Sequence, residues 1–70
     1  MSWIVEQKMP GVVGTMECAT HKEAQHEAAV IAKGHRDNGR EVLGSSKDDY
    51  YIIATDNPAQ VLTVEVYHKD

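Results

Sequence analysis

The sequence predicts an α+β fold in which one helix, about residues 21–37, packs on one face of an antiparallel sheet of about five strands, in the order ββαβββ. Alternation of apolar and polar residues between turn signals is typical of strands joined as hairpins. Only one stretch repeats small apolar residues at helical spacing instead. Seventy residues leave room for one core, so we expect a single domain, 1–70.

The first two strands form a predicted hairpin. Residues 2–8 alternate weakly, and Met9-Pro10-Gly11 then gives a strong turn signal. Residues 12–18 form the second strand, although its glycine weakens it.

The helix has clear start and stop signals. Thr20 suits the N-cap, and Glu23 three residues later completes a capping box. Gly39 is well placed for a left-handed C-terminal cap. The face between them is small, with one large side chain, and consists of Ala24, Ala28, Ile31 and Ala32.

The remainder reads as a three-stranded meander over residues 40–45, 50–55 and 61–67. Its turns are expected at Ser46-Lys47-Asp48-Asp49 and Asp56-Asn57-Pro58-Ala59. The sheet side of the core is expected from Trp3, Val5, Met16, Leu62, Val64 and Val66.

The stretch Tyr50-Tyr51-Ile52-Ile53 is apolar on both sides of a strand. Strands of this kind are usually covered on both faces, but one helix covers only one face. We therefore expect a second copy of the chain to cover the other face, with a foreign protein as the alternative occupant. Either pair of the central strand could face outward, and we assign the pair Tyr51 and Ile53. The full predicted interface is Ile4, Val13, Leu43, Tyr51, Ile53, Val61 and Tyr67.

Composition excludes several classes of protein. A net charge of −4 argues against a nucleic-acid binder, which needs a basic surface. No apolar run approaches the ~20 residues that cross a bilayer, so we expect no membrane partner. The single cysteine, Cys18, excludes a disulfide framework within the chain. No signal peptide is visible, and we expect a cytoplasmic protein.

Chemistry-bearing residues are few. Cys18-Ala19-Thr20-His21 has the spacing of a two-ligand metal clip, but a structural zinc site needs a second clip. No base is identifiably oriented to activate Cys18 as a nucleophile. We expect no metal, no cofactor and no enzymatic activity.

Polar residues are expected to gather where the helix ends, beside two turns. Lys33, His35, Arg36 and Arg40 could there bind a small anion or nucleotide in an oligomer. The alternative interpretation is that they only complement the helix dipole. The expected function is therefore a small accessory module that binds proteins and self-associates, most simply as a homodimer, and an anion binder is the alternative. In size the chain resembles small accessory proteins of bacteria and their phages.

Overall fold

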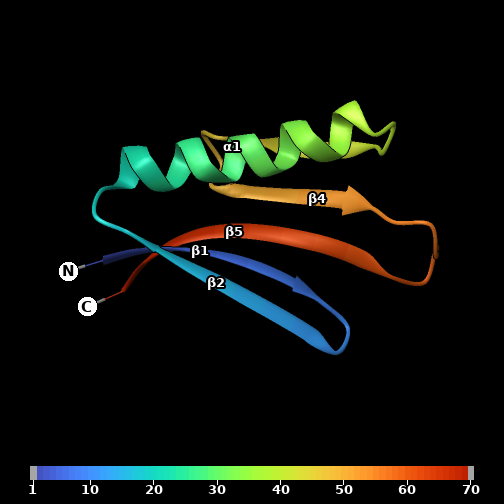
Figure 1. The fold of residues 1–70 in the computed structure, drawn as a ribbon, viewed down its shortest axis with the longest axis horizontal. Coiled ribbons are helices and arrows are strands. Elements are labelled where there is room, and N and C mark those ends of the chain that lie inside the picture. The colour runs from blue at the N-terminus through green and yellow to red at the C-terminus, as the bar shows by residue number, and fades with distance from the viewer. Residues whose placement is uncertain (1, 70) are drawn as a thin grey trace.

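The computed structural model describes residues 2–69 and confirms the predicted α+β fold (Figure 1). The sheet and helix follow the order ββαβββ. Their bounds are β1 Ser2–Met9, β2 Val12–Cys18, α1 His21–Asp37, β3 Val42–Ser45, β4 Tyr50–Ala54 and β5 Val61–Lys69. The strands therefore lie within a few residues of their predicted positions.

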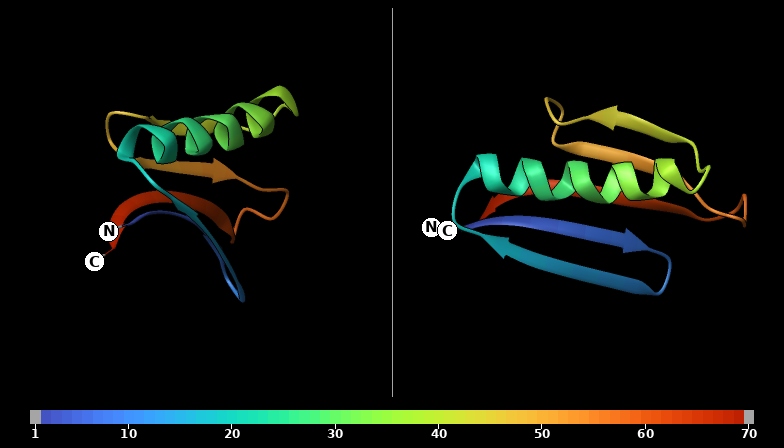
Figure 2. Two further views of the ribbon diagram at one scale, coloured as in Figure 1. Left: turned by 60° about the vertical axis from the view of Figure 1, so that its left-hand side comes forward. Right: turned by 45° about the horizontal axis from the view of Figure 1, so that its top comes forward.

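All five strands belong to one antiparallel sheet of order β2-β1-β5-β4-β3. The helix runs over one face and packs mainly against β1 and β5 in the middle of the sheet, while most of β2 lies to one side of it (Figure 2). β2 and β3 are the two edges of the sheet. We call the face without the helix the open face.

Local contacts explain where the helix begins and ends. Thr20 Oγ1 accepts a hydrogen bond from the Glu23 backbone N–H at 3.1 Å, which satisfies an amide that has no partner within the helix. The Glu23 carboxylate accepts from the Ala19 N–H at 3.3 Å, one residue earlier than in the predicted capping box. Gly39 ends the helix at φ +83, as the left-handed cap requires.

The core lies between the small face of α1 and the sheet. Ala24 and Ala28 are at most 1% exposed, so the helix backbone approaches the strands closely. Val5, Ile53 and Val64 fill the sheet side and are also at most 1% exposed.

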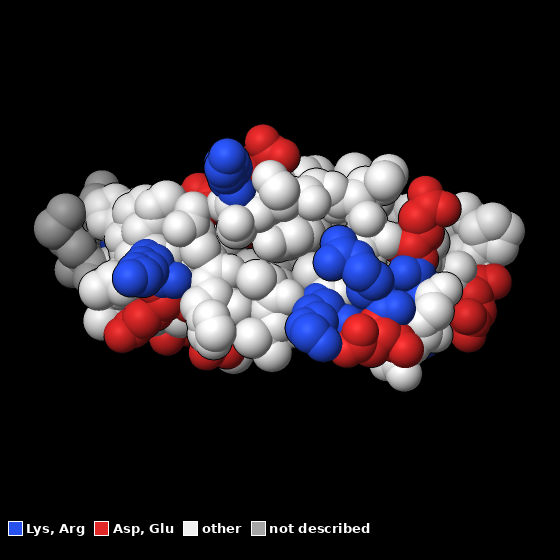
Figure 3. All heavy atoms as spheres, turned by 90° about the horizontal axis from the view of Figure 1, so that it is seen from above, with Lys and Arg blue, Asp and Glu red and all other residues white. Residues whose placement is uncertain are grey.

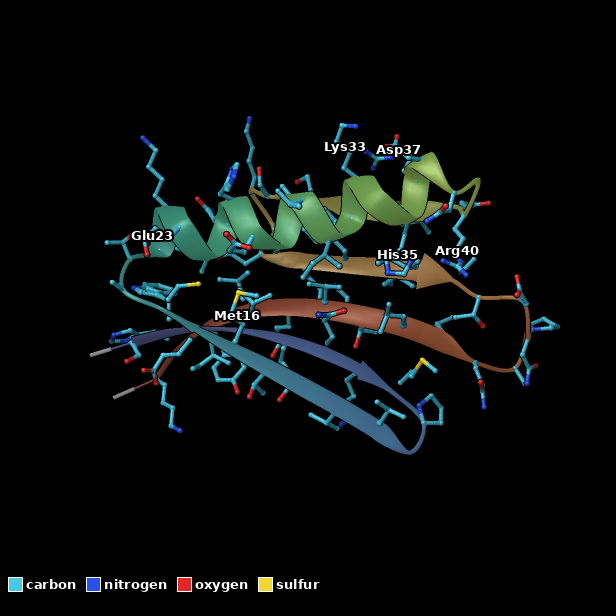
Figure 4. The ribbon with its side chains drawn as sticks, viewed as in Figure 1. Met16, Glu23, Lys33, His35, Asp37 and Arg40 are labelled. Carbon is cyan, nitrogen blue, oxygen red and sulfur yellow. The ribbon has the colours of Figure 1, made fainter. Side chains whose placement is uncertain are left out.

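One predicted core residue lies elsewhere. Met16 is 43% exposed, although its side chain is directed toward the helix side of the sheet (Figure 4). The reason is that β2 diverges from the axis of α1 (Figure 1), so the helix covers β2 only near Cys18. Val12, on the same side of β2, is 59% exposed.

The short edge strand β3 has a tight approach to its neighbour. Gly44 has φ +107, and a Cβ atom at this position would collide with the backbone carbonyl oxygen of Tyr50. Only glycine fits both conditions.

No helix among residues 2–69 combines the length and the apolar character needed to cross a bilayer.

Candidate interaction surface

The register of the strands determines which residues share the open face. Side chains directly opposite each other in a sheet point to the same side. Since Val5 pairs with Val66 in the core, their neighbours along each strand point away from the helix. Five of the predicted interface residues lie on the open face, namely Ile4, Val13, Leu43, Val61 and Tyr67.

The assignment of Tyr51 and Ile53 to this interface differs from the structure. They are 4% and 0% exposed and pack beneath α1. Tyr51 lies opposite Val64, which belongs to the same core. The other pair of the strand, Tyr50 and Ile52, therefore occupies the open face. Both pairs are apolar, so the sequence pattern did not distinguish them.

The open face has an apolar half, which lies over β3, β4 and the start of β5. Leu43 lies directly opposite Ile52, and Ala54 directly opposite Val61. Leu43 is 56% exposed, Val61 46% and Tyr50 38%. We call these five residues the apolar patch. Three of its members, Tyr50, Ile52 and Ala54, were not among the predicted interface residues, because the side to which they point depends on the register of β4 with β5.

Two glutamates, Glu6 on β1 and Glu65 on β5, lie directly opposite each other in the middle of the same face, and we call them the acidic row. On its other side, Glu65 lies directly opposite Tyr50 on β4. Like charges at directly opposite positions destabilise a sheet. Tyr67 is hydrogen-bonded to Glu6, and partial burial, followed by the two carboxylates, raises the pKa of its hydroxyl.

Ile4 and Val13 lie apart from the apolar patch. Ile4 is only 5% exposed although it belongs to the open face. β1 and β5 bend with their convex side toward the helix (Figure 1), so the side chains beneath crowd together. Val13 lies at the β2 edge, separated from Ile52 by Lys8 and Thr63 in the same row.

The four predicted anion ligands do not converge. His35 and Arg40 line a cavity of about 300 Å³ with residues of the turn before β5, and Arg40 Nη1 lies 3.0 Å from His35 Nδ1. Lys33 instead pairs with Asp37 at 2.8 Å on the outer side of the helix (Figure 4). Arg36 is exposed and acts electrostatically on Tyr51, so it belongs to the β4 side.

Basic side chains do gather above the C-terminal end of the helix, as predicted, with acidic side chains among them (Figure 3). The turn residues Asp56 and Asn57 line the same small cavity as His35. The C-terminal end of the helix and the turn before β5 therefore lie at one end of the molecule, but the basic side chains at this end point in different directions.

Cys18 and His21 form no recognisable chemical site. Burial, and then the carboxylates of Glu27 and Glu23, raise the pKa of the Cys18 thiol, which disfavours the reactive thiolate. His21 Nε2 is engaged by Asp49 at 2.8 Å. Within residues 2–69, no group of three or more His, Cys, Asp or Glu is arranged to hold a metal ion.

The fold and this surface define a small α+β domain with one covered and one uncovered sheet face. Comparison of the chain with protein-family models, with curated proteins and with solved structures found no match.

Proposed function

We propose that this protein is a small, non-enzymatic protein-interaction module that presents its open sheet face to another protein. The observation that carries the proposal is the apolar patch bordered by the acidic row. Apolar and aromatic groups with charged groups beside them are typical of protein interfaces. A single uncrosslinked cysteine is compatible with a cytoplasmic location.

The chemistry of the face specifies the kind of partner. Leu43, Tyr50 and Val61 offer exposed apolar area next to Glu65. Glu65 also faces Glu6 without a cation directly between them, so an incoming Lys or Arg would relieve their repulsion. The partner we propose is therefore a protein surface with an apolar centre and at least one basic side chain.

A foreign protein fits the open face better than the second copy expected from the sequence. A face-to-face dimer that covered both the apolar patch and the acidic row would bring Glu6 and Glu65 of both chains near one another. Like-charge juxtaposition at an interface costs several kcal/mol. We therefore assign this face to a foreign partner.

Selection from a random peptide library displayed on phage tests the proposal with a defined probe. The peptides selected against the wild-type protein should combine apolar residues with Lys or Arg. Leu43→Glu should weaken their binding at least tenfold, about 1.4 kcal/mol. Val30→Glu is the matched control, because Val30 is similarly exposed, 52% against 56%, but lies on the helix.

Two results would count against the proposal. One is a selection that yields no binder, or only binders without basic residues. The other is equal weakening by Leu43→Glu and Val30→Glu, which would place the binding site away from the open face.

A further inference from the structure

We infer that the free edge of β2 pairs with the β2 edge of a second copy, antiparallel and centred on Thr15, to give a continuous ten-stranded sheet. This inference uses the edge of the sheet and not the open face. It therefore does not rest on the proposed function.

The two edges of the sheet differ in their availability. β3 has four residues, and the positive φ of Gly44 interrupts its regular backbone. β2 has seven residues, and all but Cys18 are exposed. Proteins usually protect a long edge with lysine, proline or a bulge. Within β2 there is neither lysine nor proline, and Val12, Val13 and Met16 expose apolar side chains on both of its faces.

The hydrogen-bond phase of β2 follows from one bond at the other side of the sheet. The Val66 N–H donates to the Asp49 carbonyl at 2.8 Å, so the backbone groups of Val66 point toward β4. The backbone N–H and C=O of its partner Val5 therefore point toward β2 and form hydrogen bonds with the backbone of Met16. Because these directions alternate along a strand, the N–H and C=O of Thr15, the neighbour of Met16, point outward. The backbone groups of Val13 and Glu17 point outward for the same reason.

A twofold axis through Thr15 uses every outward group. Thr15 then lies opposite its own copy, and Val13 lies opposite Glu17 of the second copy. With three outward residues in each chain, this register forms about six interchain hydrogen bonds. Centring the axis on Glu17 would place two carboxylates face to face, and centring it on Val13 would run the pairing into the Pro10-Gly11 turn.

The side chains also complement one another in the Thr15-centred register. On the helix side, Met16 lies opposite Gly14 of the second copy, so a large side chain meets an empty position. Val12 of the second copy lies opposite Cys18, which lines a cavity of about 700 Å³ between β2 and the start of α1. The exposed valine thus has a space to enter, with Met16, Cys18 and Ala19 as its apolar wall and charged side chains of α1 at its border. On the open side the central pair is Thr with Thr, a favourable cross-strand pair.

The helices leave room for this pairing. α1 packs mainly against β1 and β5, and within β2 only Cys18 is buried, so the rest of this edge strand lies to one side of the helix (Figure 2). An axis perpendicular to the sheet places both helices on one side and both open faces on the other. The dimer would thus present two target-binding faces side by side.

Cysteine crosslinking tests the register directly. In a Cys18→Ala background, Thr15→Cys places two thiols at directly opposite positions, with Cα atoms about 5.5 Å apart and within disulfide reach. Val13→Cys is the matched control, because the two copies of this position would be about 13 Å apart along the strands. Mild oxidation should convert Thr15→Cys to a covalent dimer roughly tenfold faster than Val13→Cys. Equal rates would overturn the register.

Thr15→Pro tests the edge without a cysteine. The Thr15 N–H points outward, so proline there removes no bond within the chain. Native mass spectrometry at roughly 100 µM, at which an interface with a Kd of about 1 µM is mostly dimeric, should show a wild-type dimer, a dimeric Leu43→Glu variant and a monomeric Thr15→Pro variant. A monomeric wild-type protein, as expected if the edge serves a foreign strand, would overturn the inference, and so would a Thr15→Pro dimer.

Discussion

His21 Nε2 lies 2.8 Å from Asp49 Oδ2, and this contact joins the first turn of α1 to the turn before β4. Gln25 donates to the other carboxylate oxygen of Asp49 at 3.0 Å. The Asp49 carbonyl in turn accepts from the Val66 N–H. One residue thus connects the helix, the β3–β4 turn and β5, the middle strand of the sheet. Asp49 does so at φ 55, a left-handed conformation that Asp and Asn tolerate better than most residues.

We expect Asp49→Ala to lower the free energy of unfolding by about 1–2 kcal/mol, because it removes both side-chain contacts and the tolerance for left-handed backbone. The His21 side chain is 41% exposed, so its contact with Asp49 by itself contributes little. Asp49→Asn keeps the conformation and an acceptor, and should cost less. Urea unfolding followed by fluorescence of Trp3, which stacks on His21 with centroids 4.0 Å apart, measures both. Equal stability of the two variants with wild type would contradict this role of Asp49.

Gly44→Ala should destabilise the protein by about 1–3 kcal/mol, because it forces alanine into a left-handed conformation and against the Tyr50 carbonyl. Gly34→Ala is the control with the opposite sign. Gly34 lies within the helix and has open space around its Cβ position, so alanine should stabilise by about 0.5–1 kcal/mol. Thermal unfolding at one fixed protein concentration compares them. A drop in stability for Gly34→Ala would be incompatible with its exposed place in the helix.

Thr20→Ala should cost about 1 kcal/mol, because the Glu23 N–H loses its acceptor. Thr20→Ser keeps the hydroxyl and should remain close to wild type. Circular dichroism during urea unfolding measures the two variants together. If serine is as destabilising as alanine, the cap contributes through its methyl group and not through the hydrogen bond.

Cys18 should react slowly with iodoacetamide near pH 8, since burial and the nearby carboxylates raise its pKa. Unfolding in urea should accelerate the reaction on the order of a hundredfold. A thiol with a raised folded-state pKa stabilises fully below its unfolded pKa, and this contribution is lost as pH rises through the folded pKa. The pH-dependent part due to the thiol should therefore disappear in Cys18→Ala. Fast alkylation of the folded protein would contradict the burial of the thiol.

The order of elements was predictable because each has a local signal. Thr20 and Gly39 mark the helix ends, and the Pro10-Gly11 dipeptide marks the first hairpin. The choice between Tyr50–Ile52 and Tyr51–Ile53 was not predictable, because it depends on which strand faces pair with Val64 across the sheet. That register is a tertiary property, and a slip of one residue exchanges the two faces.

The candidate surfaces were predictable only in part. Leu43 and Val61 lie on the open face, where the sequence placed them. Met16, predicted in the core, lies outside it because β2 diverges from the helix. The facing pair of Glu6 and Glu65 arises from residues 59 positions apart in the chain, and no local pattern brings them together. Lys33 and His35 diverge because side chains two positions apart on a helix do not face each other, whereas Lys33 lies beside Asp37 at i,i+4.

The most direct measurement is amide hydrogen exchange along β2, resolved by NMR at low and high protein concentration. At low concentration we expect the outward amides of Val13, Thr15 and Glu17 to exchange fast, and those of Gly14 and Met16 to be protected by β1. At high concentration the three outward amides should become protected as two edges pair. Fast exchange at Val13 and Thr15 in a sample that native mass spectrometry shows to be dimeric would contradict the edge-paired assembly.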